Sequence, residues 1–372
     1  MKKYFVMAAL AVSTLTASAQ SVVPKWINNV KLSGFGIVQY TYNGQENNES
    51  NSFNLRLARL ALDGRAFDDW YWKAQIQFNG NTSTLGSSPK LVDLFIEWQK
   101  YDFLRVKAGQ FKNPFTYENP MHPIDQGFMR YSQVISKFAG FSDRAGAHSS
   151  NGRDIGVQLQ GDFLKNASGR NLIHYQVGVF NGQGINVKDV DQQKNIIGGA
   201  WVMPVEGMRL GAFGWIGSYA RKGTSASEGI TNTTLRRLQQ RRYAFSAEYK
   251  VDDWTFRSEY VHSTGYAFAK AMVNTNDASA KDITLSSNGD KSQGVYALVI
   301  APIIKKKCHA KARYDMYQPS KGAEKQRTRY EIGLDYYFNK NICLTGEYAY
   351  IHDRALADPN YSMIDVELSY RF

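Results

Sequence analysis

The stretch Tyr361-Ser-Met-Ile-Asp-Val-Glu-Leu-Ser-Tyr-Arg-Phe372 decides the predicted fold of this chain. Its apolar and polar residues alternate, as side chains do on the two faces of a β-strand. One face carries Ile364, Val366, Leu368, Tyr370 and Phe372, and the other carries polar residues and Met363. A terminal strand of this kind is typical of the closing strand of an outer-membrane barrel, which has lipid outside and water inside.

Upstream, the same alternation and the turn residues between stretches predict about sixteen strands in all. We therefore expect an all-β fold, a transmembrane antiparallel β-barrel that closes because unpaired backbone groups are costly in lipid. The predicted strands are 30–43, 52–64, 70–80, 91–99, 103–111, 152–162, 170–181, 196–203, 208–219, 239–250, 253–263, 291–302, 307–317, 327–338, 341–351 and 361–372. The stretch 52–64 changes its phase near Arg59.

The connections between these strands are long and short in turn. Short ones include 100–102 and 339–340, and long ones include 112–151, 182–195, 220–238 and 264–290. Outer-membrane barrels have short periplasmic turns on one rim and longer outer loops on the other. An even number of strands then places both chain termini on the rim with the short turns.

The N-terminus and the composition agree with export to an outer membrane. Met1-Lys-Lys, an apolar stretch and Ala17-Ser-Ala19 predict a signal peptide over residues 1–19, which leaves residues 20–372 as one barrel domain. Mean hydropathy is −0.43, and no run of 18 apolar residues occurs. A helical membrane protein is therefore excluded, whereas a barrel with a polar lumen is allowed. Cys308 and Cys343 fall on non-adjacent predicted strands, so we expect free thiols.

The formal net charge is +12. A basic lumen favours anions, whereas an exported chain has little access to nucleic acid. The alternation places a set of basic side chains on the lumen face, together with acids such as Glu331 and Glu347. These basic candidates are Lys73, Arg105, Lys107, Arg257, Lys311 and Arg313.

The longest connection, 112–151, is the third outer loop, and it is rich in aromatic residues. A loop of this length is usually functional, and this one is too apolar to lie in water. We expect it to fold into the lumen, where Lys112 and Arg130 would line a constriction; the alternative is that it packs on neighbouring subunits. At the fifth loop, Arg236, Arg237, Arg241 and Arg242 could steer anions or bind lipopolysaccharide phosphates.

Two motifs bracket the third loop, Gly109-Gln-Phe-Lys-Asn-Pro-Phe115 and Gly152-Arg-Asp-Ile-Gly-Val-Gln-Leu159. With Arg56-Leu-Ala-Arg-Leu-Ala-Leu-Asp-Gly64 and Phe128-Met-Arg-Tyr-Ser132, they resemble the phosphate-selective porin O and P family. The resemblance implies a trimeric porin of a Gram-negative outer membrane with sixteen strands and an anion-selective pore. It also implies that Arg59, Lys112, Arg130 and Arg153 line the pore.

Together these observations predict a porin and ion channel for passive diffusion of small anions, with phosphate as a candidate. Outer-membrane lipid and lipopolysaccharide are the expected surroundings, and no cofactor or metal is expected. A general or sugar-passing porin with Tyr117 and Tyr131 in one line is the first alternative. A structural barrel closed by its third loop is another. A barrel enzyme is disfavoured, because no HExxH, GxSxG or P-loop motif occurs.

Overall fold

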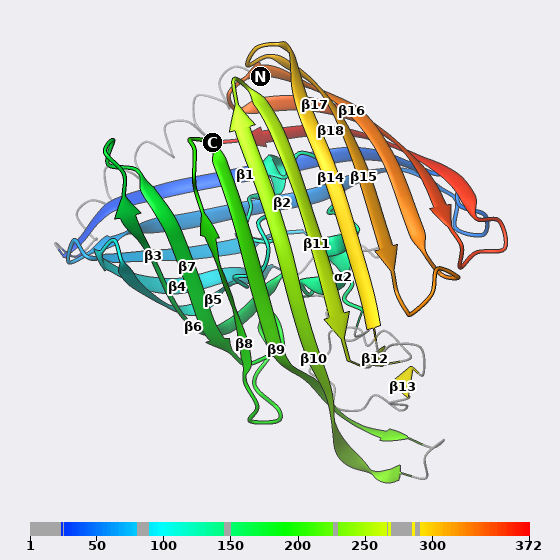
Figure 1. Ribbon diagram of the computed structural model, residues 1–372, viewed down its shortest axis with the longest axis horizontal. Coiled ribbons are helices and arrows are strands. Elements are labelled where there is room, and N and C mark those ends of the chain that lie inside the picture. The colour runs from blue at the N-terminus through cyan, green and yellow to red at the C-terminus, as the bar shows by residue number, and fades with distance from the viewer. Residues whose placement is uncertain are drawn as a thin grey trace, which may run out of the picture.

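The computed structural model describes residues 24, 26–79, 89–144, 150–225, 230–265, 267–268, 285–286 and 291–372. Within these ranges, sixteen strands pair antiparallel and close into a barrel (Figure 1). The first strand pairs with the last, for example Tyr40 with Val366. The predicted all-β antiparallel barrel is therefore confirmed, whereas the predicted signal peptide lies outside the described residues.

The barrel strands, labelled as in Figure 1, have the following bounds. They are β1 (Ile27–Asn43), β2 (Ser50–Ala66), β3 (Trp70–Gln77), β4 (Lys90–Tyr101), β5 (Leu104–Lys112), β6 (Arg153–Lys165), β7 (Asn171–Phe180), β8 (Asn195–Val202), β9 (Met208–Ser225), β10 (Ile230–Val251), β11 (Trp254–Thr264), β14 (Lys291–Ile304), β15 (Cys308–Gln318), β16 (Arg327–Asn339), β17 (Ile342–Asp353) and β18 (Asn360–Arg371).

Two predicted loops contain more structure than expected. The prediction that 220–238 is a loop was wrong. Strands β9 and β10 continue there as a paired ribbon, from Arg237 opposite Ala220 to Ile230 opposite Ser225. The connection 264–290 includes a two-stranded sheet of β12 (Ala267–Phe268) and β13 (Leu285–Ser286). A polar hairpin has no alternation of apolar and polar residues, so the sequence pattern could not predict strands in this part of the chain.

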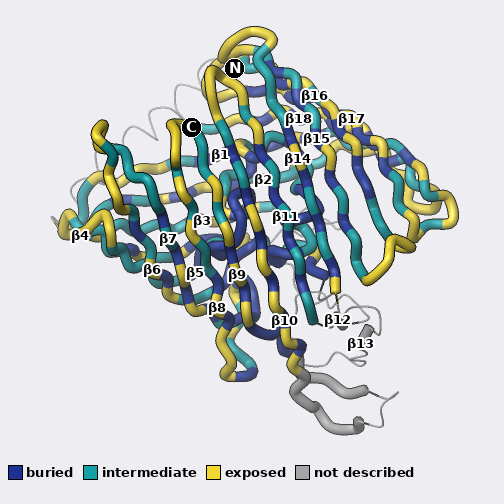
Figure 2. The backbone as a smooth tube through the Cα atoms, viewed as in Figure 1, coloured by how far each residue is buried: buried dark blue, intermediate teal, exposed yellow. Residues whose placement is uncertain are grey.

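The two faces of the strands differ as the alternation predicts, and buried and exposed residues succeed one another along the strands (Figure 2). In β18, Val366 is 39% exposed and Leu368 is 42% exposed, whereas Asp365 and Glu367 are almost fully buried. Exposed apolar side chains on the outer face suit a lipid environment, and polar side chains on the inner face line the interior. Cys308 and Cys343 are free, as predicted.

The phase change predicted in the second strand is present in β2 as an irregularity of its pairing with β1. The register shifts where Leu55 and Leu57 occupy successive pairs, which leaves Arg56 as an extra residue. Such a bulge turns the side chains that follow it onto the other face. Arg56 and Arg59 are consequently both turned away from the exposed outer face, where Leu55 and Leu60 lie.

The connection between β5 and β6 carries two short helices, η1 (Pro123–Asp125) and α2 (Gln133–Phe138). Its apolar residues are buried against the barrel strands: Phe115, Phe128 and Phe138 belong to one cluster with Trp215 of β9 and Tyr317 of β15. The helix α2 contacts β11, β14 and β15, behind which it is visible in Figure 1. No described helix is long and apolar enough to cross a membrane.

Candidate pore site

Five of the ten candidate cations line one cavity of about 290 Å³, beside the β2–β6 part of the barrel. They are Arg59, Lys73, Lys107, Lys112 and Arg153, and we call this cavity the basic pocket. Asp93 is the carboxylate among the residues that line it. Positive charge therefore exceeds negative charge at its surface.

Strand register explains why distant residues meet in the basic pocket. Arg59 of β2 lies opposite Gln77 of β3, and Lys112 of β5 lies opposite Arg153 of β6. Neighbouring strands are about 5 Å apart, so side chains from β2 to β6 on the inner face reach the same space.

Two of the five cations have a carboxylate partner. Arg153 donates two hydrogen bonds to Asp93, from Nε at 2.7 Å and from Nη2 at 3.2 Å. Lys107 Nζ lies 3.5 Å from Glu97 Oε2. Bidentate pairing holds the Arg153 guanidinium in place. The longer contact between Lys107 and Glu97 fixes the Lys107 ammonium less firmly.

The other three cations have no carboxylate partner among the described residues. Arg59 Nε donates to Gln77 Oε1 at 3.0 Å. Lys112 Nζ donates to the carbonyl oxygen of Met121. Lys73 has neither a hydrogen bond nor an ion pair within the described part of the chain and is half-buried. These three side chains carry the charge excess of the basic pocket.

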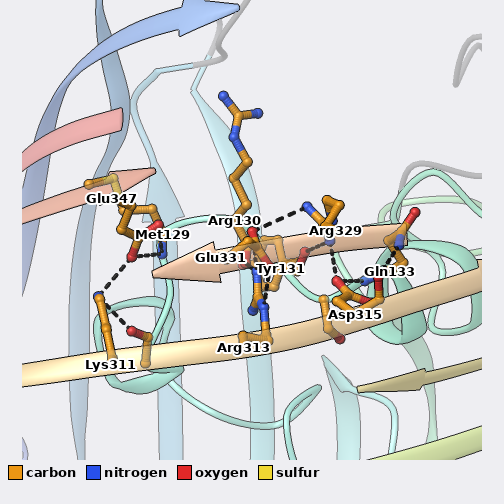
Figure 3. Close-up of polar contacts among 12 residues, drawn as sticks. Met129, Arg130, Tyr131, Gln133, Lys311, Arg313, Asp315, Arg329, Glu331 and Glu347 are labelled. Atoms are coloured by element: carbon orange, nitrogen blue, oxygen red, sulfur yellow. Dashed lines mark hydrogen bonds and ion pairs between the residues drawn. The ribbon is translucent and has the colours of Figure 1, made fainter. Parts of the chain in front are cut away.

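The opposite wall, formed by β14 to β17, uses its cations differently (Figure 3). Lys311 Nζ lies 2.8 Å from Asp335 and 2.7 Å from Glu347, and it donates to the carbonyl oxygen of Gly127 at 2.7 Å. Gly333 separates Lys311 from Glu347 in the strand register, and a Cβ there would lie 2.8 Å from Lys311 Cε. The missing side chain thus lets a buried ion pair span three strands.

Arg313 repeats this arrangement one step along β15. Its Nε lies 2.6 Å from Glu331 Oε2, and its Nη2 donates at 2.9 Å to the carbonyl oxygen of Arg130. The side chain of Arg130 points away from this pair in Figure 3 and makes a bidentate contact with Asp365, at 2.7 and 2.9 Å. Both cations are neutralised by carboxylates.

The last two candidates are also paired. Arg257 Nε lies 2.7 Å from Glu248, and its Nη1 donates at 2.9 Å to the carbonyl oxygen of Gln126. Arg105 pairs with Asp162. Arg257, Lys311 and Arg313 therefore hold the backbone of the β5–β6 connection as well as a carboxylate.

Further inward side chains, outside the ten candidate cations, hold the same segment. Glu259 accepts hydrogen bonds from the backbone N–H groups of Tyr117 at 2.6 Å and Glu118 at 2.9 Å. Arg329 pairs with Asp315 and donates at 2.9 Å to the Tyr131 carbonyl oxygen. Arg329 shares a face with Glu331, so alternation places it inward as well.

Arg56 could not have been found in that way. It pairs with Glu367 Oε2 at 2.7 Å and donates to the carbonyl oxygen of Met129. Strict alternation from Leu60 backwards assigns Arg56 to the outer face, and only the bulge in β2 turns it inward.

His122 is the titratable side chain of the loop segment at the edge of the basic pocket. Its pKa is lowered to about 4, first by burial and then by Lys112 and Arg59, against the opposing effect of Asp125. Its Nδ1 accepts a hydrogen bond from the Ile124 N–H at 3.3 Å. The imidazole is therefore neutral at pH 7 and adds no charge to the pocket.

A comparison with protein families gives a match to part of the chain. Residues 33–191 match the family described as phosphate-selective porin O and P, and this range includes both motifs that bracket the third loop. This match and the closed sixteen-stranded barrel support an outer-membrane porin and point to a channel.

Solved porin structures share the fold of this chain at low identity. OmpTdeltaL8 of Vibrio cholerae, a loop L8 deletion mutant, matches with a TM-score of 0.62 and 12% identity over 92% of this chain and 99% of that one. The outer membrane channel DcaP of Acinetobacter baumannii has a TM-score of 0.62 and 13% identity over 92% and 97%. The anion-selective porin from Comamonas acidovorans has 0.60 and 13% over 92% and 99%. No curated protein matches significantly.

Proposed function

We propose that this porin lets small anions, with phosphate among them, diffuse passively through its barrel. The observation that carries the proposal is the basic pocket, where five cations face a single lining carboxylate. Each unit charge contributes on the order of 1 kcal/mol at about 4 Å in water. A surplus of such charges raises the local concentration of anions and lowers it for cations.

We further propose that the β5–β6 connection narrows the lumen. Its backbone is held by inward side chains of the far wall, including Glu259, Lys311, Arg313 and Glu347. Its other edge reaches the basic pocket through Pro120, Met121, His122 and Pro123. A segment that touches both sides of the interior would force a passing ion close to the five cations.

A planar-bilayer measurement tests the proposed selectivity. The reversal potential of the purified porin in a KCl gradient should have the sign of chloride preference, and conductance should persist when phosphate replaces chloride. A preference for potassium would overturn the anion assignment. Absence of any conductance would favour a barrel closed by its third loop.

The sugar-passing alternative depends on a line of aromatic side chains. Tyr117 is buried, with its ring 5.6 Å from that of Trp201 and 5.5 Å from that of Phe213. Tyr131 packs instead against Phe141, with ring centroids 4.3 Å apart. These contacts give no support to a shared stacking track, so we put forward no second function.

Assembly and export are proposed on separate grounds. We propose a homotrimer, because the similar OmpT of Vibrio cholerae has been solved in a trimer form at a TM-score of 0.58. We also propose cleavage after Ala19, on the sequence pattern of residues 1–19. Cross-linking in membranes and the mass of the mature chain test these two proposals.

A further inference from the structure

A basic row lies on the outer face of the barrel, apart from the pore. Arg241 of β10 is opposite Thr264 of β11, which is opposite Lys291 of β14. Arg241 and Lys291 are exposed, and two strand spacings place their Cα atoms about 10 Å apart. Thr264 ends β11 and Lys291 begins β14, and both border a long loop, which belongs to the external side of an outer-membrane barrel. Arg241 lies within β10 at the same level, because it pairs with Thr264.

Next to this row, on the side toward the short turns, the outer surface has the composition of a membrane interface. Tyr243 and His262 stack with ring centroids 5.1 Å apart at an angle of 25°. Tyr260 donates from its hydroxyl to Gln293 at 2.9 Å. One level lower, Phe245 is 56% exposed. Charged, aromatic and apolar levels thus follow one another, as they do across the edge of a bilayer.

The structure separates the four arginines that the sequence grouped. Arg242 is buried and pairs with Asp143 at 2.8 Å, and Arg237 pairs with Asp191 at 3.4 Å. The side chain of Arg236 lies outside the described residues. Among the described residues, the side chains of Arg241 and Lys291 have no carboxylate partner and no hydrogen bond.

Polar side chains in a second part of the rim form hydrogen bonds with one another, unlike the two cations of the basic row. On β17 and β18, His352 and Tyr350 both hydrogen-bond to Asn360 Oδ1, each at 2.8 Å. Polar groups there satisfy one another, whereas the two cations of the basic row remain available to an external anion.

We infer that Arg241 and Lys291 bind the phosphate groups of a phosphorylated glycolipid in the outer leaflet. The long side chains reach the headgroup level while Tyr243 and Phe245 contact the sugar and the acyl chains. A basic residue near an anionic membrane surface gains about 1 kcal/mol, so the two together strengthen binding about thirtyfold. This site goes beyond the proposed pore function and does not depend on it.

Binding of bisphosphorylated lipid A to the detergent-purified porin tests the inference, with dephosphorylated lipid A and inorganic phosphate as separate probes. The unmodified porin should bind the bisphosphorylated lipid about thirtyfold more tightly than Arg241→Gln/Lys291→Gln does. Dephosphorylated lipid A should bind both proteins equally weakly, and Arg241→Lys should retain most of the affinity. Inorganic phosphate should not compete at millimolar concentration.

The matched control is Lys305→Gln/Lys340→Gln, which removes the same charge from exposed positions in short turns at the other rim. It should bind like the unmodified porin. Equal loss in both double variants, or no loss in either, overturns the site. A changed oligomeric state with unchanged lipid binding overturns it as well, because the row would then be a contact between copies of this chain. Folding is checked by the heat-dependent mobility of the barrel, and unchanged ion selectivity separates this test from that of the pore.

Discussion

The two sides of this barrel use the same residue types for different purposes. Beside β2 to β6, Arg59 and Lys73 contact no carboxylate among the described residues and line an open cavity. On β15, Lys311 and Arg313 are buried against carboxylates and donate to loop carbonyl oxygens. All four belong to the inner faces of their strands, so the face alone does not decide the role.

The difference lies in what surrounds each charge. A buried cation needs a carboxylate, because an unpaired charge out of water is costly. Lys73 is half-buried beside the cavity, so it keeps more of its hydration and remains available to a passing anion, whereas Arg59 is almost fully buried and is held by neutral Gln77. The β15 side therefore holds the loop in place, and the β2–β6 side presents charge.

The largest expected effect is a loss of stability when a β15 cation that holds the β5–β6 connection is removed. Lys311→Met leaves Asp335 and Glu347 buried without their shared cation. Removing one partner of a buried ion pair costs about 3–5 kcal/mol of unfolding free energy. Guanidinium unfolding in lipid vesicles measures it.

The matched variant is Lys73→Met, which removes the same kind of charge from the basic pocket. It should change the unfolding free energy by less than about 0.5 kcal/mol. Equal losses in the two variants would contradict the division of roles between the two sides.

The second effect is on selectivity. Lys73→Glu changes the charge of the basic pocket by two units and should reduce the anion-to-cation permeability ratio about fivefold, which corresponds to about 1 kcal/mol. Reversal potentials in a KCl gradient measure the ratio. Lys340→Glu, with the same charge change in an exposed turn, should leave it nearly unchanged. A similar shift in both variants would mean that overall charge, and not the pocket, sets selectivity.

The third effect is a pH dependence of stability. Since the pKa of His122 is about 4 in the folded protein and about 6.5 when unfolded, the unfolded state binds more protons between these values. Stability should therefore fall as pH decreases from about 6.5 to about 4, by less than about 1 kcal/mol between pH 7 and pH 6. His122→Gln should remove this part of the slope, and an unchanged slope in guanidinium midpoints would refute the assignment.

The smallest effect is that of salt. The Debye length falls from about 10 Å at 0.1 M to about 3 Å at 1 M, so the charges of the basic pocket are screened. At a constant concentration ratio, the anion preference should fall about twofold over this range. The ion pairs of Lys311 are buried, so the unfolding midpoint should change little. Selectivity that is independent of salt would point to pore size instead of charge.

The sequence predicted the barrel strands within a few residues for most of their length, because lipid outside and water inside impose a period of two. It also placed Arg313 and Glu331 on one face. It did not predict Arg56, because one extra residue in β2 reverses the alternation. It did not predict the ribbon of β9 and β10 either, since that part lacks the apolar face that made the other strands recognisable.

Alternation by itself determined that this chain forms a closed barrel and, outside the bulge in β2, which residues of its strands face inward. Only the tertiary structure decided which cations are neutralised. Lys311 meets Glu347 because Gly333 leaves room between them across three strands, and the loop carbonyl oxygens add a partner from about 180 residues away in the chain. The physical reason is that alternation is a local property of the backbone, whereas ion pairing depends on register and on contacts between distant segments.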